Sequence, residues 1–338
     1  QRLSRGLGDV YKRQSLSFTY YDNIIEGILL NVALSPSSGY STQYGNYGEM
    51  TNNGMEIDLG LDLIDTSEFG LSTAINWSTN ENEVTDLFGT ESINLSPGAS
   101  VSSRAVVGYP LGSLYGTGSQ TNPDGSFILN SNGFPQITSS PIVLGDPNPD
   151  WRGGISLSMR YKKFRLNAVL EHSEGGDFSP RTLWVLRRFG TTQETANRIT
   201  LDQPLVNYRG NTIPAGTTVR GNIKDFGGGP VLLDENWYRT GIGGGFGDNQ
   251  AYNFSIADAT FTKLRDLSLS YVIDTPLVTN IGLSDVIVSL TGRDLININK
   301  VEGIDPEINT KGVSVAQGVE YFTNPQTKGF LVSLTINY

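Results

Sequence analysis

Apolar and polar side chains alternate with a period of two along several stretches of the chain. The final ten residues, GFLVSLTINY, place Phe330, Val332, Leu334, Ile336 and Tyr338 at every second position, with smaller and mostly polar residues between them. This spacing brings side chains to one face of a β-strand. The same alternation recurs at 16–20, 69–77, 155–161, 164–170, 267–273 and 286–290. The sequence therefore predicts a series of strands, each with one apolar face.

The connections between these strands alternate in length. The segments YKKF (161–164) and DTSEF (65–69) are short turns, whereas 78–151 and 173–257 are long. Aromatic residues also gather at strand ends. Short turns at one end, long loops at the other and aromatic girdles are typical of outer-membrane barrels, whose strands span about 9 to 11 residues. A soluble β-sandwich alternates in the same way, so the alternation by itself leaves both classes open.

Composition and charge narrow the choice of function. The chain has 338 residues, 40 of them glycine, and only 17% are charged, against roughly 25% in soluble domains. Its net charge of −10 argues against a nucleic-acid partner. The absence of cysteine excludes thiolate metal sites and cysteine nucleophiles in this sequence. It has no apolar run long enough for a transmembrane helix.

Residues 1–14, QRLSRGLGDVYKRQ, carry a density of basic charge that is unmatched downstream. The string resembles a translated sequencing-adaptor read-through, and we therefore set it aside as a non-native tail. A native basic arm is the alternative. Residues 15–338 are then the folded portion.

Several strings resemble the SusC/RagA family of TonB-dependent outer-membrane transporters, in collinear order over nearly all of residues 15–338. The most specific is LGDPNPDWRGGISLSMRYKKFRL (144–166). The others are the block at 18–64, YPLGSLYGTG (109–118), DATFTKLRDLSLSYVI (258–273), GRDLINI (292–298), GIDPEIN (303–309) and YFTNPQTKGFLVSLTINY (321–338). Asp294 and Lys328 depart from residues common in the family.

The resemblance implies an all-β fold: a transmembrane antiparallel β-barrel with long extracellular loops, in the Gram-negative outer membrane. About ten strands of a 22-stranded barrel are expected, with the plug domain absent, so that the chain would be the C-terminal portion. Tyr338 would be the terminal aromatic that the barrel-assembly machinery reads.

The implied function is TonB-energised import of glycan fragments or peptides, without an enzymatic step and without cofactors. The implied partners are a SusD-like surface lipoprotein, TonB through upstream parts, outer-membrane lipid and an oligosaccharide or peptide substrate. The alternatives are a secreted or surface lectin-like or adhesin-like binder with no transport role, and a barrel hydrolase.

Three motifs have ordinary structural interpretations. DPNPDW (146–151) has calcium-loop spacing at its start, but it lacks the later glycine and acidic ligand, so we expect a rigid turn and no metal. His172 has no marked nucleophile beside it and is expected at a strand end. The glycine-rich 227–230 and 241–248 lack the strand–helix context of a dinucleotide site and are expected to be flexible loops.

The long connection 174–256 is the candidate contact region, since long loops are commonly functional. Its aromatic side chains could contact substrate or a partner protein, as aromatic rings do at binding hot spots. Packing of the loops onto one another is the alternative. The candidate residues are Trp184, Trp237, Tyr238, Phe246 and Tyr252.

Overall fold

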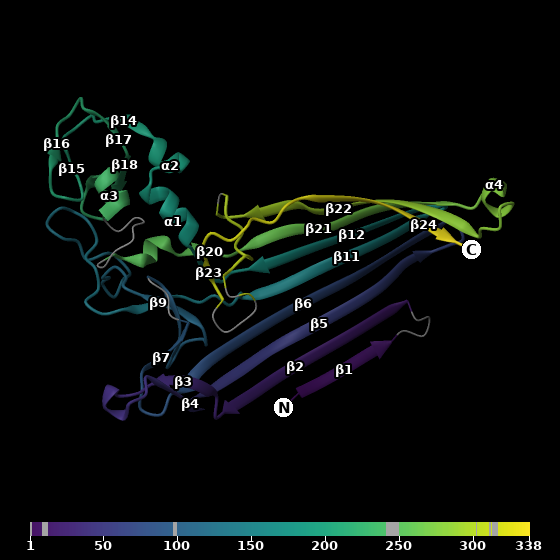
Figure 1. Ribbon diagram of the computed structural model, residues 1–338, viewed down its shortest axis with the longest axis horizontal. Coiled ribbons are helices and arrows are strands. Elements are labelled where there is room, and N and C mark those ends of the chain that lie inside the picture. The colour runs from purple at the N-terminus through teal and green to yellow at the C-terminus, as the bar shows by residue number, and fades with distance from the viewer. Residues whose placement is uncertain are drawn as a thin grey trace.

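The computed structural model describes residues 2–8 (backbone), 13–96, 100–240, 250–301, 303–310, 312 and 317–338. Its main element is a nine-stranded sheet in which every strand runs antiparallel to its neighbours. Figure 1 shows the long strands side by side as one twisted, curved band. In spatial order they are β1 (Arg2–Gly8), β2 (Gln14–Glu26), β5 (Glu49–Asp65), β6 (Phe69–Asp86), β11 (Trp151–Tyr161), β12 (Phe164–Glu174), β21 (Phe261–Ile273), β22 (Asp285–Asn299) and β24 (Gly329–Asn337).

The strands keep one register across the sheet, and this register collects the apolar residues on one face. Because directly paired residues point to the same face, an apolar row crosses six strands. The row comprises Leu71, Met159, Leu166, Leu269, Leu290 and Val332. Of these side chains, Leu269, Leu290 and Val332 are 47%, 53% and 72% exposed. An exposed apolar face of this extent is suited to lipid contact.

The opposite face is polar along the same strands. One residue further on, the paired row is Ser72, Ser158, Asn167, Ser268, Thr291 and, at its end, Leu331. Hydroxyl groups bridge adjacent strands on this face. Ser268 and Thr291 lie 2.8 Å apart, and Ser289 donates to Ser270 over 2.8 Å. The predicted alternation is therefore confirmed, and the sheet is that of a transmembrane antiparallel β-barrel protein.

The two ends of the sheet differ as the sequence predicted. At one end the β11–β12 connection is a two-residue turn in which Lys162 has a φ of 51°, and β5 joins β6 through residues 66–68. Aromatic rings line this end. The ring centroids of Phe69 and Tyr161 lie 6.5 Å apart, and those of Phe164 and Tyr271 lie 4.7 Å apart. The C-terminus and the short helix α4 (Pro276–Thr279) lie at this same end (Figure 1).

The size of the main sheet agrees with the expected partial barrel of about ten strands. Within the described residues this sheet has nine strands, and the other short strands form separate small sheets in the connections. One of the nine, β1, lies inside the segment 1–14 that was set aside, and its backbone pairs with β2. That this segment is a non-native tail stays a prediction.

The long connections fold into a compact layer at the opposite end of the sheet (Figure 1). The connection after β2 contributes β3 (Leu29–Ala33), η1 (Pro36–Ser38) and β4 (Thr42–Asn46). The connection after β6 contributes β7 (Ser92–Ser96), β8 (Ser102–Val106), β9 (Ser113–Gly116) and β10 (Ile142–Gly145). The connection after β12 contributes β13 (Asp177–Pro180), α1 (Arg181–Arg188), α2 (Gln193–Ala196), β14 (Arg198–Thr200), β15 (Leu205–Val206), β16 (Thr212–Ile213), β17 (Thr218–Arg220), β18 (Asn222–Asp225), β19 (Pro230–Leu233), α3 (Glu235–Thr240), η2 (Tyr252–Ser255) and β20 (Ala257–Asp258). The connection after β22 contributes β23 (Val319–Glu320).

The glycines at 227–229 form a tight hairpin turn between β18 and β19, held by the Asp225 carboxylate, and not a flexible loop. Residues 241–248 lie outside the described residues.

The buried core lies in this loop layer, and not under the sheet. Its largest cluster brings Phe134, from the connection after β6, against Phe226, Trp237 and Tyr238, from the connection after β12. Residues far apart in sequence therefore hold the loops together. Among the described residues, no helix is both long and apolar enough to cross a membrane.

Candidate functional site

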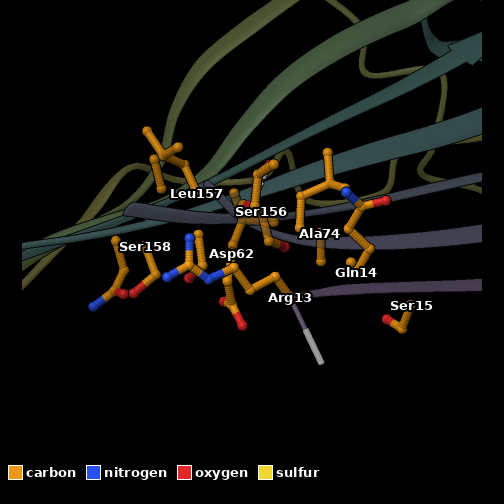
Figure 2. Close-up of a pocket in the computed structure, with 15 residues that line it drawn as sticks. Arg13, Gln14, Ser15, Asp62, Ala74, Ser156, Leu157 and Ser158 are labelled. Atoms are coloured by element: carbon orange, nitrogen blue, oxygen red, sulfur yellow. Dashed lines mark hydrogen bonds between the residues drawn. The ribbon is translucent and has the colours of Figure 1, made fainter. Parts of the chain in front are cut away.

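The polar face of the sheet is hollowed into a cavity of about 470 Å³. It is lined by residues of β2, β5, β6, β11 and β12, and Figure 2 shows Asp62, Ser156 and Ser158 among them. The hollow depends on small side chains. At Gly60 a Cβ would come within 2.6 Å of the Ser15 hydroxyl oxygen. The serine, asparagine and aspartate side chains of this wall can exchange hydrogen bonds with a hydrophilic molecule.

The loop layer contains four of the five candidate aromatic residues, all of them buried. Trp184 and Trp237 are 3% and 4% exposed, and Tyr238 and Tyr252 are 4% and 6% exposed. Phe246 lies outside the described residues. Burial is what the loop-packing alternative predicts, since a ring that binds cargo directly needs an accessible face. A contact role for these residues stays a prediction.

Trp184 and Tyr252 tie the connection after β12 to that after β6. Their rings stack with centroids 5.7 Å apart and an interplanar angle of 19°. They pack on Val101 and Leu114 of the preceding connection. The backbone N–H of Tyr252 donates to the Thr117 carbonyl oxygen over 2.8 Å. This pair therefore fixes the two long connections to each other.

Trp237 lies at the centre of the larger cluster. Its ring centroid is 5.4 Å from that of Phe134, 5.5 Å from Phe226 and 5.7 Å from Phe254. The neighbouring Tyr238 has a polar role: its hydroxyl donates to Glu194 over 3.0 Å. Burial, and then the negative charge of Glu194, raise the pKa of Tyr238 well above its ordinary value. Tyr238 therefore stays neutral and serves as a fixed hydrogen-bond donor.

A buried ionic cluster, which the sequence analysis did not anticipate, joins the sheet to the last connection. Lys263 of β21 is 1% exposed, and its ammonium group donates to Asp305 over 2.7 and 2.8 Å and to Glu307 over 2.6 Å. Arg265, at a bulge in β21, donates to Glu171 over 2.6 Å and pairs with Glu307. The segment 303–310 is thereby held against the polar face of the sheet. No local sequence signal indicates this cluster, because its members are about forty or more residues apart.

The DPNPDW segment and the single histidine have structural contacts. The Asp146 carboxylate accepts hydrogen bonds from the backbone N–H and the side-chain amide of Asn148, over 2.9 and 2.7 Å. Burial raises the pKa of Asp146, and the nearby Asp150 adds to this effect. The turn delivers Trp151 onto His172, with ring centroids 4.7 Å apart. His172 also bonds to Thr262 and Glu174 near the end of β12, as expected for a strand-end histidine. In the described part of the chain, no cluster of three or more His, Cys, Asp or Glu is arranged to hold a metal ion.

Comparison with known proteins gives relatives of one kind. No family model matches the chain. It is 25% identical to TonB-dependent receptor P3 of Formosa agariphila over 96% of its own length, and 24% identical to receptor P26 of that organism over 94%. Among solved structures, the RagAB peptide transporter matches all of the chain with a TM-score of 0.67 at 20% identity, and the closed-closed state of the RagAB peptide importer matches it with a TM-score of 0.66 at 19%.

The chain spans about a third of these proteins: 32% of receptors P3 and P26, and 35% of the solved chains. The matches cover nearly the whole chain, and the solved structures share its fold. The relatives are receptors and transporters by name. The chain accordingly has the fold of part of an outer-membrane β-barrel, and over nearly its whole length it resembles TonB-dependent receptors.

Proposed function

We propose that the receptor containing this chain imports glycan fragments or peptides across the outer membrane, energised through TonB. The observation that carries the proposal is the two-faced sheet, with an apolar row outside and a hydroxyl-rich wall inside, beneath a folded loop layer. Such a wall suits the passage of a hydrophilic cargo, since it offers many hydrogen bonds and no strong single site. The chain supplies wall and loops, and performs no chemistry on the cargo.

A SusD-like surface lipoprotein is the proposed partner at the loop end. The name of the RagAB peptide importer supports transport by a receptor of this fold, but says nothing of the cargo of this chain. The loop layer contains several small sheets and buried aromatic clusters, so it presents a structured surface. Because the loops are already ordered, docking of a partner costs little conformational entropy.

A pair of adjacent substitutions in β11 tests the proposal in cells that depend on the receptor. Ser156 lines the inner cavity, whereas Ile155 lies on the other face and is 45% exposed. Ser156→Trp places a bulky ring inside the wall and is expected to lower uptake of labelled cargo. Ile155→Trp places the same ring in lipid and is expected to leave uptake unchanged. Both variants must show the heat-modifiable mobility of an assembled barrel.

Uptake is measured with labelled oligosaccharide and peptide mixtures, with and without functional TonB, and lipoprotein association by co-purification. The proposal expects uptake that needs both the receptor and TonB, and a lipoprotein that co-purifies with the receptor. Uptake that is unchanged when the receptor is deleted, or cargo that is bound and never imported, would favour the surface-binder alternative.

A further inference from the structure

A separate cavity lies within the loop layer. It has a volume of about 720 Å³ and lies among the C-terminal end of α1, the end of β17 and the start of α3. Cavities of about 300–1,000 Å³ are the usual size for small-ligand sites. This cavity is separate from the inner wall of the sheet, and its lining residues differ from those of that wall.

Four arginines line the cavity: Arg187, Arg188, Arg220 and Arg239. They come from three elements, and a hydrogen bond or ion pair to a neighbouring residue holds each in place. Arg188 donates to the Arg239 carbonyl oxygen over 2.7 Å, which joins α1 to α3. Arg220 donates to the carbonyl oxygens of Gly190 and Thr195. Guanidinium groups fixed in this way are already positioned before a ligand arrives, so binding costs less ordering of side chains.

The acidic residues cancel this charge only in part, because four arginines and two carboxylates, those of Asp234 and Glu235, line the cavity. Both oxygens of Asp234 are engaged in structure, accepting from Asn207 over 2.8 Å and from the Asn236 backbone N–H over 2.9 Å. Glu235 pairs with Arg239 over 2.6 Å, with its side chain 72% exposed. Arg187 pairs with Glu194 over 2.8 Å. Arg220 bonds carbonyl oxygens, which leave its positive charge in place. In a chain of net charge −10, the cavity is a local positive region.

An aromatic ring lies beside the four guanidinium groups. Phe189 lines the cavity and is 71% exposed, in contrast to the buried rings of the loop cores. A large exposed ring at a cavity edge offers a flat apolar surface to a ligand, and arginine offers a planar fork that matches a carboxylate. We propose that this cavity binds an oligosaccharide that bears carboxylate groups, with the arginines on the carboxylates and Phe189 on a sugar face.

The mixed lining favours an acidic sugar over an acidic peptide. The exposed carboxylate of Glu235 can accept hydrogen bonds from the several hydroxyl groups of each sugar unit, whereas a polyglutamate segment offers only its backbone N–H groups. Asn236 and Thr195 add further neutral hydrogen-bonding groups to the lining. The inference rests on the proposed import function for the nature of the cargo. It concerns binding alone, so its test does not require transport.

Binding is measured by calorimetry on the intact receptor in detergent. The probe is the trimer of galacturonic acid, with a neutral galactose trimer and triglutamate as comparisons. The proposal expects the acidic sugar to bind at least about tenfold more tightly than either comparison. Its affinity should fall as salt is added. Equal binding of the neutral trimer would overturn the assignment of carboxylate recognition. Tighter binding of triglutamate would overturn the assignment to a sugar.

Arg239→Gln removes one guanidinium from the cavity, and its side chain is 58% exposed, so the fold should tolerate the change. The matched control is Arg209→Gln, which removes an exposed arginine of the same connection that does not line the cavity. Arg239→Gln should weaken binding of the acidic trimer about tenfold, Arg239→Lys less, and Arg209→Gln not at all. Equal effects of the two glutamine variants would show non-specific attraction and overturn the site. Uptake of neutral cargo by Arg239→Gln is measured in parallel. Uptake that still depends on the receptor shows that the import function holds, whatever the binding measurements say about the site.

Discussion

At the scale of single residues, a few side chains join segments that are far apart in the sequence. Lys263 meets Asp305 and Glu307, and Trp237 meets Phe134. None of these contacts could be predicted from the sequence. Lys263 and Arg265 show only that β21 has a polar face, and nothing near them indicates an acidic partner some forty residues later. The composition of the long connection did single out its aromatic residues, but composition does not distinguish a ring that binds cargo from one that packs a loop.

The ionic cluster predicts how the segment 303–310 responds to acid. Burial would by itself raise the pKa of the Glu307 carboxyl, but Arg265 and Lys263 outweigh it and hold the pKa at about 2. A lowered pKa in the folded state means that the carboxylate stabilises the segment above its unfolded pKa of 4.5 and loses this effect as the pH falls from 4.5 towards 2. Hydrogen exchange in the segment should therefore become faster across this window. The variant Glu307→Gln should show a smaller change, and an equal change in both proteins would contradict the assignment.

Trp237 predicts the stability of the loop layer. Replacing it with alanine should cost the layer about 3–5 kcal/mol, because the buried ring leaves a cavity between two connections. Hydrogen exchange across 100–240 measures the loss, while heat-modifiability reports the barrel. The control is Tyr44→Ala in β4, an aromatic residue of the same end that is 69% exposed, and its effect should be within about 0.5 kcal/mol. Hydrogen exchange in the loop layer of Trp237→Ala that is as slow as in the wild type would contradict this role in packing.

At the scale of elements, the strands were predictable and the loop layer was not. A strand with one face in lipid and one in water repeats its pattern every two residues, so the signal is local. The short turns were also readable, since Lys162 and Lys163 leave no room for any other connection between β11 and β12. The small sheets and helices of the long connections lack such a period, because their positions depend on packing between connections.

The terminal strand offers a direct comparison of its two faces. Leu334 pairs with Val288 on the apolar face, and the adjacent Thr335 pairs with Ile287 on the other face. Leu334→Arg puts a charge into lipid and should cost about 2–4 kcal/mol in the free energy of unfolding, whereas Thr335→Arg should cost much less. Refolding of the receptor into liposomes measures both. Equal costs would mean that the two faces have been assigned wrongly.

At the scale of the whole molecule, the sheet is organised between an apolar exterior and a polar interior. Eight of its nine strands have described side chains, and their register carries one apolar row from β2 to β22 and another from β6 to β24. Within the described residues β24 pairs on one side only, with β22. A lipid environment demands a partner for every strand edge, so we expect further strands of the receptor to pair with it.

The central claim is that one face of this sheet meets lipid and the other meets water, and spin-label accessibility tests it most directly. The chain contains no cysteine, so single cysteines can be placed along β12 of a cysteine-free receptor in liposomes. Leu166 and Ala168 lie on the apolar face, and Arg165 and Asn167 on the polar face. We expect collisions with oxygen to peak at 166 and 168 and collisions with a water-soluble nickel complex to peak at 165 and 167. Accessibility without this two-residue period, or with the two reagents reversed, would contradict the account.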